Sequence, residues 1–187
     1  IGTNIFVWIR DNKVMRITPR HNSAVNDYWM PDAHRLNVDF YNENRVSGVQ
    51  IKGNIPVNFA DGINRAAGHL KAADGNMVFL GSAYASFESN YALKELAGAY
   101  GVNTIHYVPH VEKGHGDDWL IADDRTPNAA ACELLGFEAI TAEDLKAKLD
   151  AGEINFLYSL ENDATFATLG TSVAKATTIV HGHQYQE

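Results

Sequence analysis

In the stretch Asn76–Gly101, the pattern of apolar and polar residues changes from that of a strand to that of a helix. Four consecutive apolar residues, Met77–Leu80, precede a turn of small residues, Gly81–Ala83. Apolar residues then recur at helical spacing, and Gly101 stands where a C-terminal cap is expected. A buried strand, a tight turn and a helix form the first half of a parallel βαβ unit. Because such sheets bind ligands beyond the carboxyl ends of their strands, the loop Gly81–Ala85 is the first candidate site.

The amino-terminal part has a different pattern, typical of a small β module. Residues 4–20 contain two runs of alternating side chains around Asp11-Asn12-Lys13, which predicts a hairpin with its turn at these three residues. Residues 21–44 are polar, aromatic and irregular, and residues 46–52 include one further short strand. The segment Asn54-Ile55-Pro56 is interpreted as a linker.

The remainder of the chain alternates between strand and helix patterns, which predicts an α/β fold with a parallel, helix-covered sheet. We therefore expect two domains, a small β module at residues 1–55 and an α/β domain at residues 56–187. Besides the Asn76–Gly101 unit, the α/β domain is expected to contain strands at residues 104–108, 154–160 and 176–180, and helices that begin near Asn58, Thr126 and Thr141.

Composition narrows the possible functions. The 187 residues are 45% hydrophobic and 20% charged, which is ordinary for a globular protein, and the net charge of −8 does not favour nonspecific nucleic-acid binding. No apolar run approaches the roughly 20 residues of a membrane span, so direct membrane insertion is not expected. The single Cys132 excludes an internal disulfide and a multi-cysteine zinc or iron–sulfur site made from this chain alone. Because the first residue is Ile1 and not Met, we expect a piece of a longer protein.

Two histidine-containing segments are candidate metal sites. The loop that follows residue 107 concentrates residue types that bind transition metals, but their spacing matches no zinc signature, so a solvated polar loop is the preferred interpretation. His181-Gly182-His183 could chelate a metal, although a frayed tail is the simpler explanation. The ligand candidates of the loop are His106, His110, Glu112, His115, Asp117 and Asp118.

Three further features have both a functional and a structural interpretation. Gly81-Ser82 at a strand end could cradle a phosphate, but both phosphate-loop motifs are missing and a tight turn is sufficient to explain it. Cys132 is interpreted as a buried small hydrophobe and not as a nucleophile. Trp8 and the Tyr28-Trp29 pair are expected to pack the small module onto its neighbour, or, if exposed, to form a partner surface.

The amino-terminal module resembles that of the molybdopterin oxidoreductase superfamily, and most closely the G subunit family of proton-pumping NADH:quinone oxidoreductase, respiratory complex I. The frame in that family is a glycine-led strand, V-x-R-[IV]-x-P-R, an Asn, and then W-[IL]-x-D-x-x-R-[FL]. The corresponding residues are Gly2–Ile5, Val14-Met-Arg-Ile-Thr-Pro-Arg20 and Asn26-Asp-Tyr-Trp-Met-Pro-Asp-Ala-His-Arg-Leu36.

The α/β domain is similar to the bacterial G subunit in three further motifs, namely S-x-x-A-S-x-E-x-N, G-D-D-x-L … D-x-x-P-N … L-G, and G-x-I-x-x-L-Y. The resemblance thus extends along nearly the whole chain, in order. The residues that carry these motifs are Gly81-Ser-Ala-Tyr-Ala-Ser-Phe-Glu-Ser-Asn90, Gly116-Asp-Asp-x-Leu120, Asp123-x-x-Thr-Pro-Asn128, Leu134-Leu-Gly136 and Ala151-Gly-Glu-Ile-Asn-Phe-Leu-Tyr158.

The departures from the family pattern concern the iron–sulfur cluster. Catalytic members of the superfamily bind a [4Fe–4S] cluster here through four cysteines, but Gly2-Thr3 stands where the leading cysteine run ends, and Pro31 stands at the last ligand position. Ala33 replaces a lysine that lies between cluster and pterin in cofactor-bearing relatives. Many complex I members likewise lack this cluster and bind no molybdenum cofactor. The resemblance therefore implies a module that has lost its redox chemistry.

The resemblance implies a structural role in the peripheral arm of complex I, with other subunits of that arm as partners. It places the arm on the cytoplasmic side of the inner membrane in bacteria and on the matrix side in mitochondria. Neither a catalytic residue nor a cofactor is expected in this piece, and the iron–sulfur clusters belong elsewhere in the parent protein. Two alternatives stay open: a fragment of a working molybdopterin enzyme resembling formate dehydrogenase, and a free-standing nucleotide-binding module that uses Gly81-Ser82.

Overall fold

The computed structural model describes residues 2–32, 35, 37–52, 54–111, 113–119 and 122–182, and these form two compact units. The first unit extends to Ser47 and the second begins at Gly48. No helix in the described ranges is long and apolar enough to cross a membrane.

The first unit contains the predicted hairpin. Its strands β1 (Ile5–Arg10) and β2 (Lys13–Pro19) are antiparallel. Both turn residues, Asp11 and Asn12, have positive φ angles of 50° and 58°, which matches the twist of a tight hairpin and suits Asp and Asn. The short helix α2 (Asp39–Asn42) is tied to the hairpin by the side chain of Asn42, which hydrogen-bonds to the backbone N–H and C=O of Val14 at 2.8 and 2.9 Å.

The second unit begins with a small ladder, of which the sequence pattern predicts the first strand but not the second. The segment interpreted as a linker contains β4 (Ile55–Pro56), which pairs with β3 (Gln50–Ile51) in an antiparallel arrangement. The ladder is joined to helix α3 (Phe59–Ala72), because the Val49 side chain lies so close to Gly62 that a Cβ there would overlap it. This contact explains why the residues just before position 56 group with the α/β unit.

The prediction of an α/β fold with a parallel sheet is confirmed. Within the described residues the sheet has five strands in the order β7-β6-β5-β8-β9, and all its pairs are parallel. The edge strand β7, which follows Phe137, is not predicted by the sequence pattern. The strands are β5 (Met77–Gly81), β6 (His106–Tyr107), β7 (Glu138–Ala139), β8 (Phe156–Leu160) and β9 (Thr177–His181).

The helices begin where the sequence supplies caps. Asn58, Ser86 and Thr141 each accept a hydrogen bond from the backbone N–H three residues later, which satisfies one of the free amides of a first helical turn. Gly101 has a φ of 76° just after the second of these helices, as a C-terminal cap requires. The remaining elements are α4 (Phe87–Ala99), α5 (Ala129–Leu134), α6 (Ala142–Asp150), α7 (Asp163–Leu169) and the 3-10 helix η1 (Gly170–Lys175).

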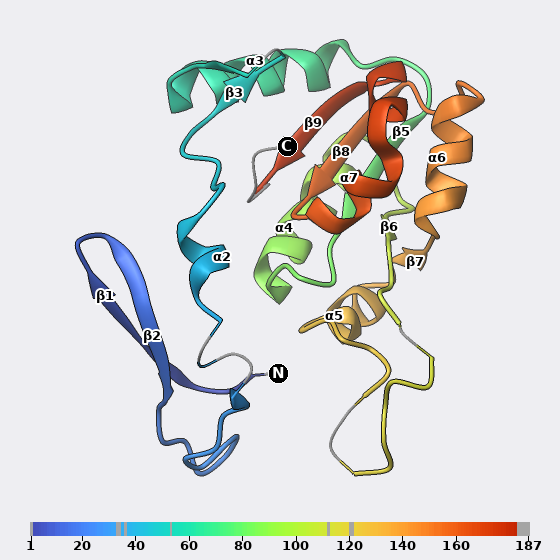
Figure 1. Ribbon diagram of the computed structural model, residues 1–187. Coiled ribbons are helices and arrows are strands. Elements are labelled where there is room, and N and C mark those ends of the chain that lie inside the picture. Colours follow the sequence, from blue (N-terminus) through green and yellow to red (C-terminus); the bar gives the residue numbers. More distant parts are fainter. Residues whose placement is uncertain are drawn as a thin grey trace. The chain divides into compact units, whose positions relative to one another are not determined.

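The core lies on both faces of the sheet, since neighbouring residues of a strand point to opposite sides. Phe79 packs with Leu93 of α4 on one face, whereas Leu80 packs with Leu145 and Leu149 of α6 on the other. All five residues of β8 are buried, as expected for a central parallel strand. Figure 1 shows α4 and α6 on the two sides of the sheet. The unit is therefore doubly wound around β5 and β8.

Candidate functional site

The site that this topology predicts lies at the carboxyl ends of β5 and β8. From β5 the chain continues through α4 to β6 on one side, and it later returns through α6 to β8 on the other. The order of strands therefore reverses between β5 and β8, and ligands of open α/β sheets bind at such a point. The segments that meet there are the predicted loop Gly81–Ala85 and the first residues after β8.

The turn after β5 is closed by side chains of the protein itself. The Asn90 side chain accepts a hydrogen bond from the Ser82 N–H at 3.0 Å and donates one to the Ser82 carbonyl at 2.9 Å. The Ser82 hydroxyl accepts a hydrogen bond from the Tyr84 N–H at 3.1 Å and donates to the Glu161 carbonyl at 2.7 Å. Ser82 and Asn90 are fully buried. The backbone amides of residues 82 and 84, which could have bound a phosphate, are thus already paired.

Packing accounts for the glycine in this turn. A Cβ on Gly81 would overlap the Phe137 ring and lie 2.9 Å from the Asn90 amide oxygen. The position therefore requires glycine in order to accommodate the closing side chains, without any need for a ligand.

A second buried amide joins the two central strands. The Asn162 side chain, which is 2% exposed, donates to the Gly81 carbonyl at 3.2 Å, the Leu160 carbonyl at 2.7 Å and the Ser159 hydroxyl at 3.1 Å. This amide thus supplies hydrogen bonds to carbonyls at the ends of both β5 and β8, where buried polar groups need partners.

Titratable side chains gather beside this point, where β8 and β9 end. Glu161 has a φ of 47°, which is uncommon for a residue with a side chain, and its N–H donates to the His181 carbonyl at 2.8 Å. Burial raises the pKa of Glu161, while the neighbouring His181 lowers it and Asp163 raises it. The Tyr158 hydroxyl lies 2.9 Å from Nδ1 of His181, and burial raises the pKa of that tyrosine. His181 is the last residue of β9, so the interpretation of a frayed tail is wrong for it.

The long loop after β6 is attached to the turn at two places. The Asn128 N–H donates to the Ala83 carbonyl at 2.9 Å, and its side chain donates to the Ala85 carbonyl at 2.9 Å. The His110 ring lies against the Tyr84 ring, with 5.2 Å between centroids. Burial lowers the pKa of His110 and is opposed by Asp124. These contacts hold the base of the loop against the turn.

The loop's candidate metal ligands lie in different surroundings. His106 is on β6, whereas His110 packs on Tyr84, and no group of three or more His, Cys, Asp or Glu in the described parts of the chain could hold a metal ion. Within the loop, Asp123 joins two segments, because its carboxylate accepts a 2.6 Å hydrogen bond from the Gly116 N–H. That bond is the main cause of its lowered pKa. Of the residues singled out from the sequence, Ala33, Glu112, Leu120 and His183 lie outside the described residues.

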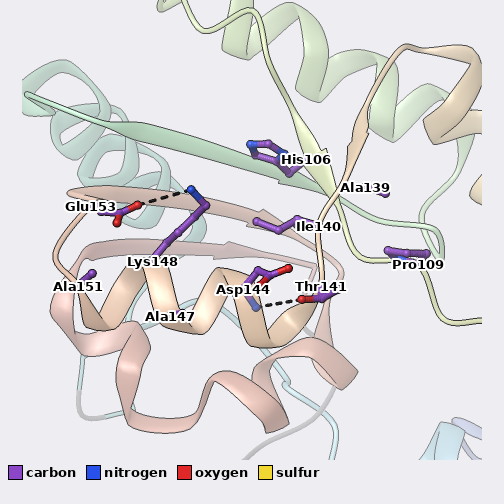
Figure 2. Close-up of a pocket in the computed structure, with 10 residues that line it drawn as sticks. All are labelled: His106, Pro109, Ala139, Ile140, Thr141, Asp144, Ala147, Lys148, Ala151 and Glu153. Carbon is purple, nitrogen blue, oxygen red and sulfur yellow. Dashed lines mark hydrogen bonds and ion pairs between the residues drawn. The ribbon is translucent and has the colours of Figure 1, made fainter.

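A groove of about 650 Å³ lies on the face of the sheet that carries α6, and sequence reasoning missed it. Figure 2 shows His106 of β6 on one side of the groove and α6 on the other. Nδ1 of His106 is buried and has no hydrogen-bond partner among the described residues. Lys148 on α6 forms an ion pair with Glu153 at 3.5 Å. The lining residues are His106, Pro109, Ala139, Ile140, Thr141, Asp144, Ala147, Lys148, Ala151 and Glu153.

One signal in the sequence points to this groove. Ile105 and Tyr107 alternate with His106, and both pack into the core on the α4 side. The alternation of a strand therefore turns His106 toward the α6 side, where a polar residue on an apolar face is unusual. The groove mixes a lysine, two carboxylates and an apolar floor, so its charge favours no single class of ligand.

In the first unit, a single asparagine joins three segments of the backbone. The Asn26 side chain accepts a hydrogen bond from the Asn4 N–H at 3.0 Å and donates to the carbonyls of Arg20 and Trp29 at 3.2 and 3.1 Å. These bonds join the start of β1, the end of β2 and the segment before Pro31. These segments are thus held together by direct hydrogen bonds within the chain.

The residues present do not fit a [4Fe–4S] cluster. Such clusters are held by cysteine thiolates, and the sequence has no cysteine before Cys132. Cys132 lies on α5 of the other unit, where it is fully buried, and desolvation together with the charge of Glu133 raises its pKa to about 12. A thiol in that state is neither a ready ligand nor a ready nucleophile.

Comparisons with known proteins agree with the resemblance seen in the sequence. Residues 1–39 match the family model of the NADH-ubiquinone oxidoreductase NDSU1/NuoG-like 4Fe-4S domain. The G subunit of the NADH-quinone oxidoreductase of Shewanella oneidensis is 37% identical over 103 residues, which is 53% of this chain and 11% of that protein. The corresponding G subunit of Pseudomonas fluorescens is 32% identical over 114 residues, which is 60% of this chain and 12% of the relative.

A more distant relative extends the agreement. The NADH-quinone oxidoreductase G subunit of Rickettsia conorii is 27% identical over 115 residues, which is 57% of this chain and 17% of that protein. The matched region thus spans a small fraction of the length of these curated relatives. The resemblance inferred from the motifs is confirmed, since about half of this chain is similar to the G subunits of NADH-quinone oxidoreductases.

Proposed function

We propose that this chain is a structural part of a protein like the G subunit of NADH:quinone oxidoreductase and holds no redox centre of its own. The parent complex transfers electrons from NADH to quinone through iron–sulfur clusters, which we assign to other parts of the parent protein. This part would support neighbouring subunits of the peripheral arm, on the cytoplasmic side of the inner membrane in bacteria or the matrix side in mitochondria.

The observation that carries the proposal is the Asn26 network in the segment that matches a [4Fe–4S] domain. The matched segment contains no thiolate, and Asn26 connects its backbone segments with neutral hydrogen bonds. Each such bond contributes only about 1 kcal/mol, but together they specify one arrangement of the backbone. The fold of the module can thus persist after the loss of the cluster.

The closed turn in the α/β unit supports the same proposal. In a working nucleotide or pterin site the amides after the central strand face the ligand. Here Asn90 and the Ser82 hydroxyl pair with those amides, so an anion would have to displace buried hydrogen bonds. We interpret the Gly81–Ala83 turn as the remnant of a dinucleotide site.

Metal analysis, visible absorption and electron paramagnetic resonance of the purified 187-residue chain test the proposal. The protein is prepared anaerobically so that a labile cluster is not lost. We expect it to be colourless and to contain less than stoichiometric iron and molybdenum. Stoichiometric iron would contradict the proposal, and molybdenum would favour the formate dehydrogenase-like alternative.

A nucleotide titration examines the remaining alternative. ATP and NADH should not bind the wild-type chain at millimolar concentration, because the Ser82 amide is paired. Saturable binding that is lost in a Ser82→Trp variant would favour a nucleotide-binding module. An Asn155→Ala variant, changed at an exposed position in the same unit, serves as the matched control.

A further inference from the structure

One face of the β1–β2 hairpin combines exposed aromatic rings with arginines. Phe6 and Trp8 of β1 lie opposite Thr18 and Arg16 of β2, and Arg20 follows two residues beyond Thr18 on the same side. The Phe6 side chain is 52% exposed and that of Trp8 is 49% exposed. These five side chains are called here the arginine–aromatic face.

The side chains of this face hold one another in place. The indole N–H of Trp8 donates to the Thr18 hydroxyl at 2.9 Å. The Arg16 guanidinium carbon lies 4.6 Å from the centre of the Trp8 ring, and that of Arg20 lies 6.0 Å from the centre of the Phe6 ring. A planar guanidinium on a ring keeps the N–H groups of its edge available for a carboxylate. Both arginines are therefore partly ordered before any partner binds.

Among the described residues, these two arginines form no ion pair. Neither Arg16 nor Arg20 has a carboxylate of that part of the chain at ion-pair distance, whereas Arg10 lies 3.5 Å from Asp11. Residues 2–20 include four basic residues and one acidic residue, although the chain as a whole carries a net charge of −8. The hairpin is thus a local cationic surface on an acidic protein.

We propose that the arginine–aromatic face docks an acidic surface of a partner protein, with carboxylates that accept paired hydrogen bonds from Arg16 and Arg20. Four residues along a strand place these arginines about 13 Å apart, and the carboxylates of the partner should have that separation. Nucleic acid fits less well, because the guanidiniums already occupy the ring faces that bases would stack on.

Docking would also stabilise the hairpin by covering its exposed apolar side chains. An isolated pair of strands is marginally stable in water, and here most apolar side chains of β1 are more than one-third exposed. The inference rests on the proposed function in one respect: the partner is sought among the subunits of the same complex.

Photo-crosslinking in the parent complex tests this inference. A benzoylphenylalanine replaces Phe6 in the full-length parent protein, the complex is purified and irradiated, and mass spectrometry identifies the attached peptide. We expect one subunit, attached at a segment with at least two Asp or Glu residues. Arg16→Glu and Arg20→Glu should each lower the yield at least about tenfold. Lys13→Glu, which changes the charge of the hairpin equally, should leave the yield within twofold.

Two further variants separate docking from folding. Arg16→Lys keeps the charge and removes the planar fork, so it should cause a smaller loss than Arg16→Glu. Replacing the crosslinked acidic residue by Arg should restore the yield in the Arg16→Glu background, which a misfolded hairpin could not do. Equal losses from Lys13→Glu and Arg16→Glu, or rescue failing at every crosslinked carboxylate, would overturn the inference.

The crosslinked species also distinguishes the possible ligands. Attachment to lipid, to nucleic acid or only within the chain itself would overturn the inference. An acidic segment of a protein outside the NADH:quinone oxidoreductase complex would support the inference and contradict the proposed function. Absence of other complex subunits from the wild-type preparation would contradict the proposed function alone, and crosslinking would then be performed in intact cells.

Discussion

Replacing Asn90 by Ala tests the idea that the turn after β5 is closed by the protein's own side chain. The substitution removes the acceptor of the buried Ser82 N–H and the donors to the carbonyls of Ser82 and Ser86, at 2.9 and 3.2 Å. The Ser86 carbonyl keeps a bond from the backbone N–H of residue 90, and the Ser82 carbonyl keeps one from the Ala85 N–H at 3.2 Å. The Ser82 N–H is therefore the group that loses its partner.

The expected loss follows from this count. A buried peptide N–H that loses its partner costs about 1–3 kcal/mol. We therefore expect the free energy of unfolding of the α/β unit to fall by about 1–3 kcal/mol, which corresponds to a drop of about 3–11 °C in Tm for a unit of this size.

The assay is urea and thermal unfolding followed by circular dichroism at 222 nm, because α3 to α7 all belong to the α/β unit. Asn155→Ala is the matched control. Its side chain also accepts a backbone hydrogen bond, from the Asn76 N–H at 3.1 Å, but it is exposed, so water replaces the bond and the loss should stay within about 0.5 kcal/mol. Equal losses for the two variants would refute the reasoning.

Three further outcomes are expected. Gly81→Ala should destabilise the α/β unit by more than about 2 kcal/mol, because the added Cβ has no room. Gly98→Ala, on the open side of α4, should stabilise the unit by about 0.5–1 kcal/mol. Chemical denaturation measures both changes. Burial raises the pKa of Glu161 above its ordinary value, so the folded state binds the proton more tightly than the unfolded state. The free energy of unfolding should therefore fall as the pH rises from the ordinary pKa of a glutamate through the raised pKa of the folded state. Glu161→Gln should therefore gain stability over wild type at neutral pH and lose the advantage below the ordinary pKa, as pH-dependent denaturation would show. The pKa of Cys132 is about 12, so Ellman's reagent at pH 8 should modify it only after denaturation; labelling of the native protein within minutes would contradict its burial.

The sequence predicts the elements whose signals are local. The caps at Asn58, Ser86 and Thr141 and the apolar runs of β5 and β8 are where side-chain chemistry and backbone structure agree, so these helices and central strands can be recognised. The turn at Asp11 is recognisable for the same reason.

Strands that form only by pairing with another strand cannot be predicted from their own sequence. β7 is only Glu138–Ala139, both residues are exposed, and its strand conformation comes from pairing with β6. β4 contains Pro56, which lowers the strand signal, and it forms because its partner β3 lies beside it. Two-residue strands carry too little periodicity to be recognised from their own sequence.

The candidate site shows the same limit at the level of side chains. Sequence motifs indicate the loop after β5, but whether its amides are free depends on Asn90, eight residues later, and on Glu161 in another strand connection. The motif that contains Asn90 indicates a helix start, and it does not show where the Asn90 side chain points. Only the three-dimensional arrangement distinguishes an amide that faces a ligand from one that faces its own chain.

The two units connect separate backbone segments by the same physical means. In each, a buried or half-buried asparagine bridges backbone segments, Asn26 in the β module and Asn90 in the α/β unit. An asparagine amide is neutral and carries both a donor and an acceptor, so it can satisfy an N–H and a C=O together without a counter-ion. The proposed loss of a cofactor leaves buried polar groups that still need partners, and such amides supply them. Loss of redox chemistry, as proposed, is therefore compatible with retention of the fold.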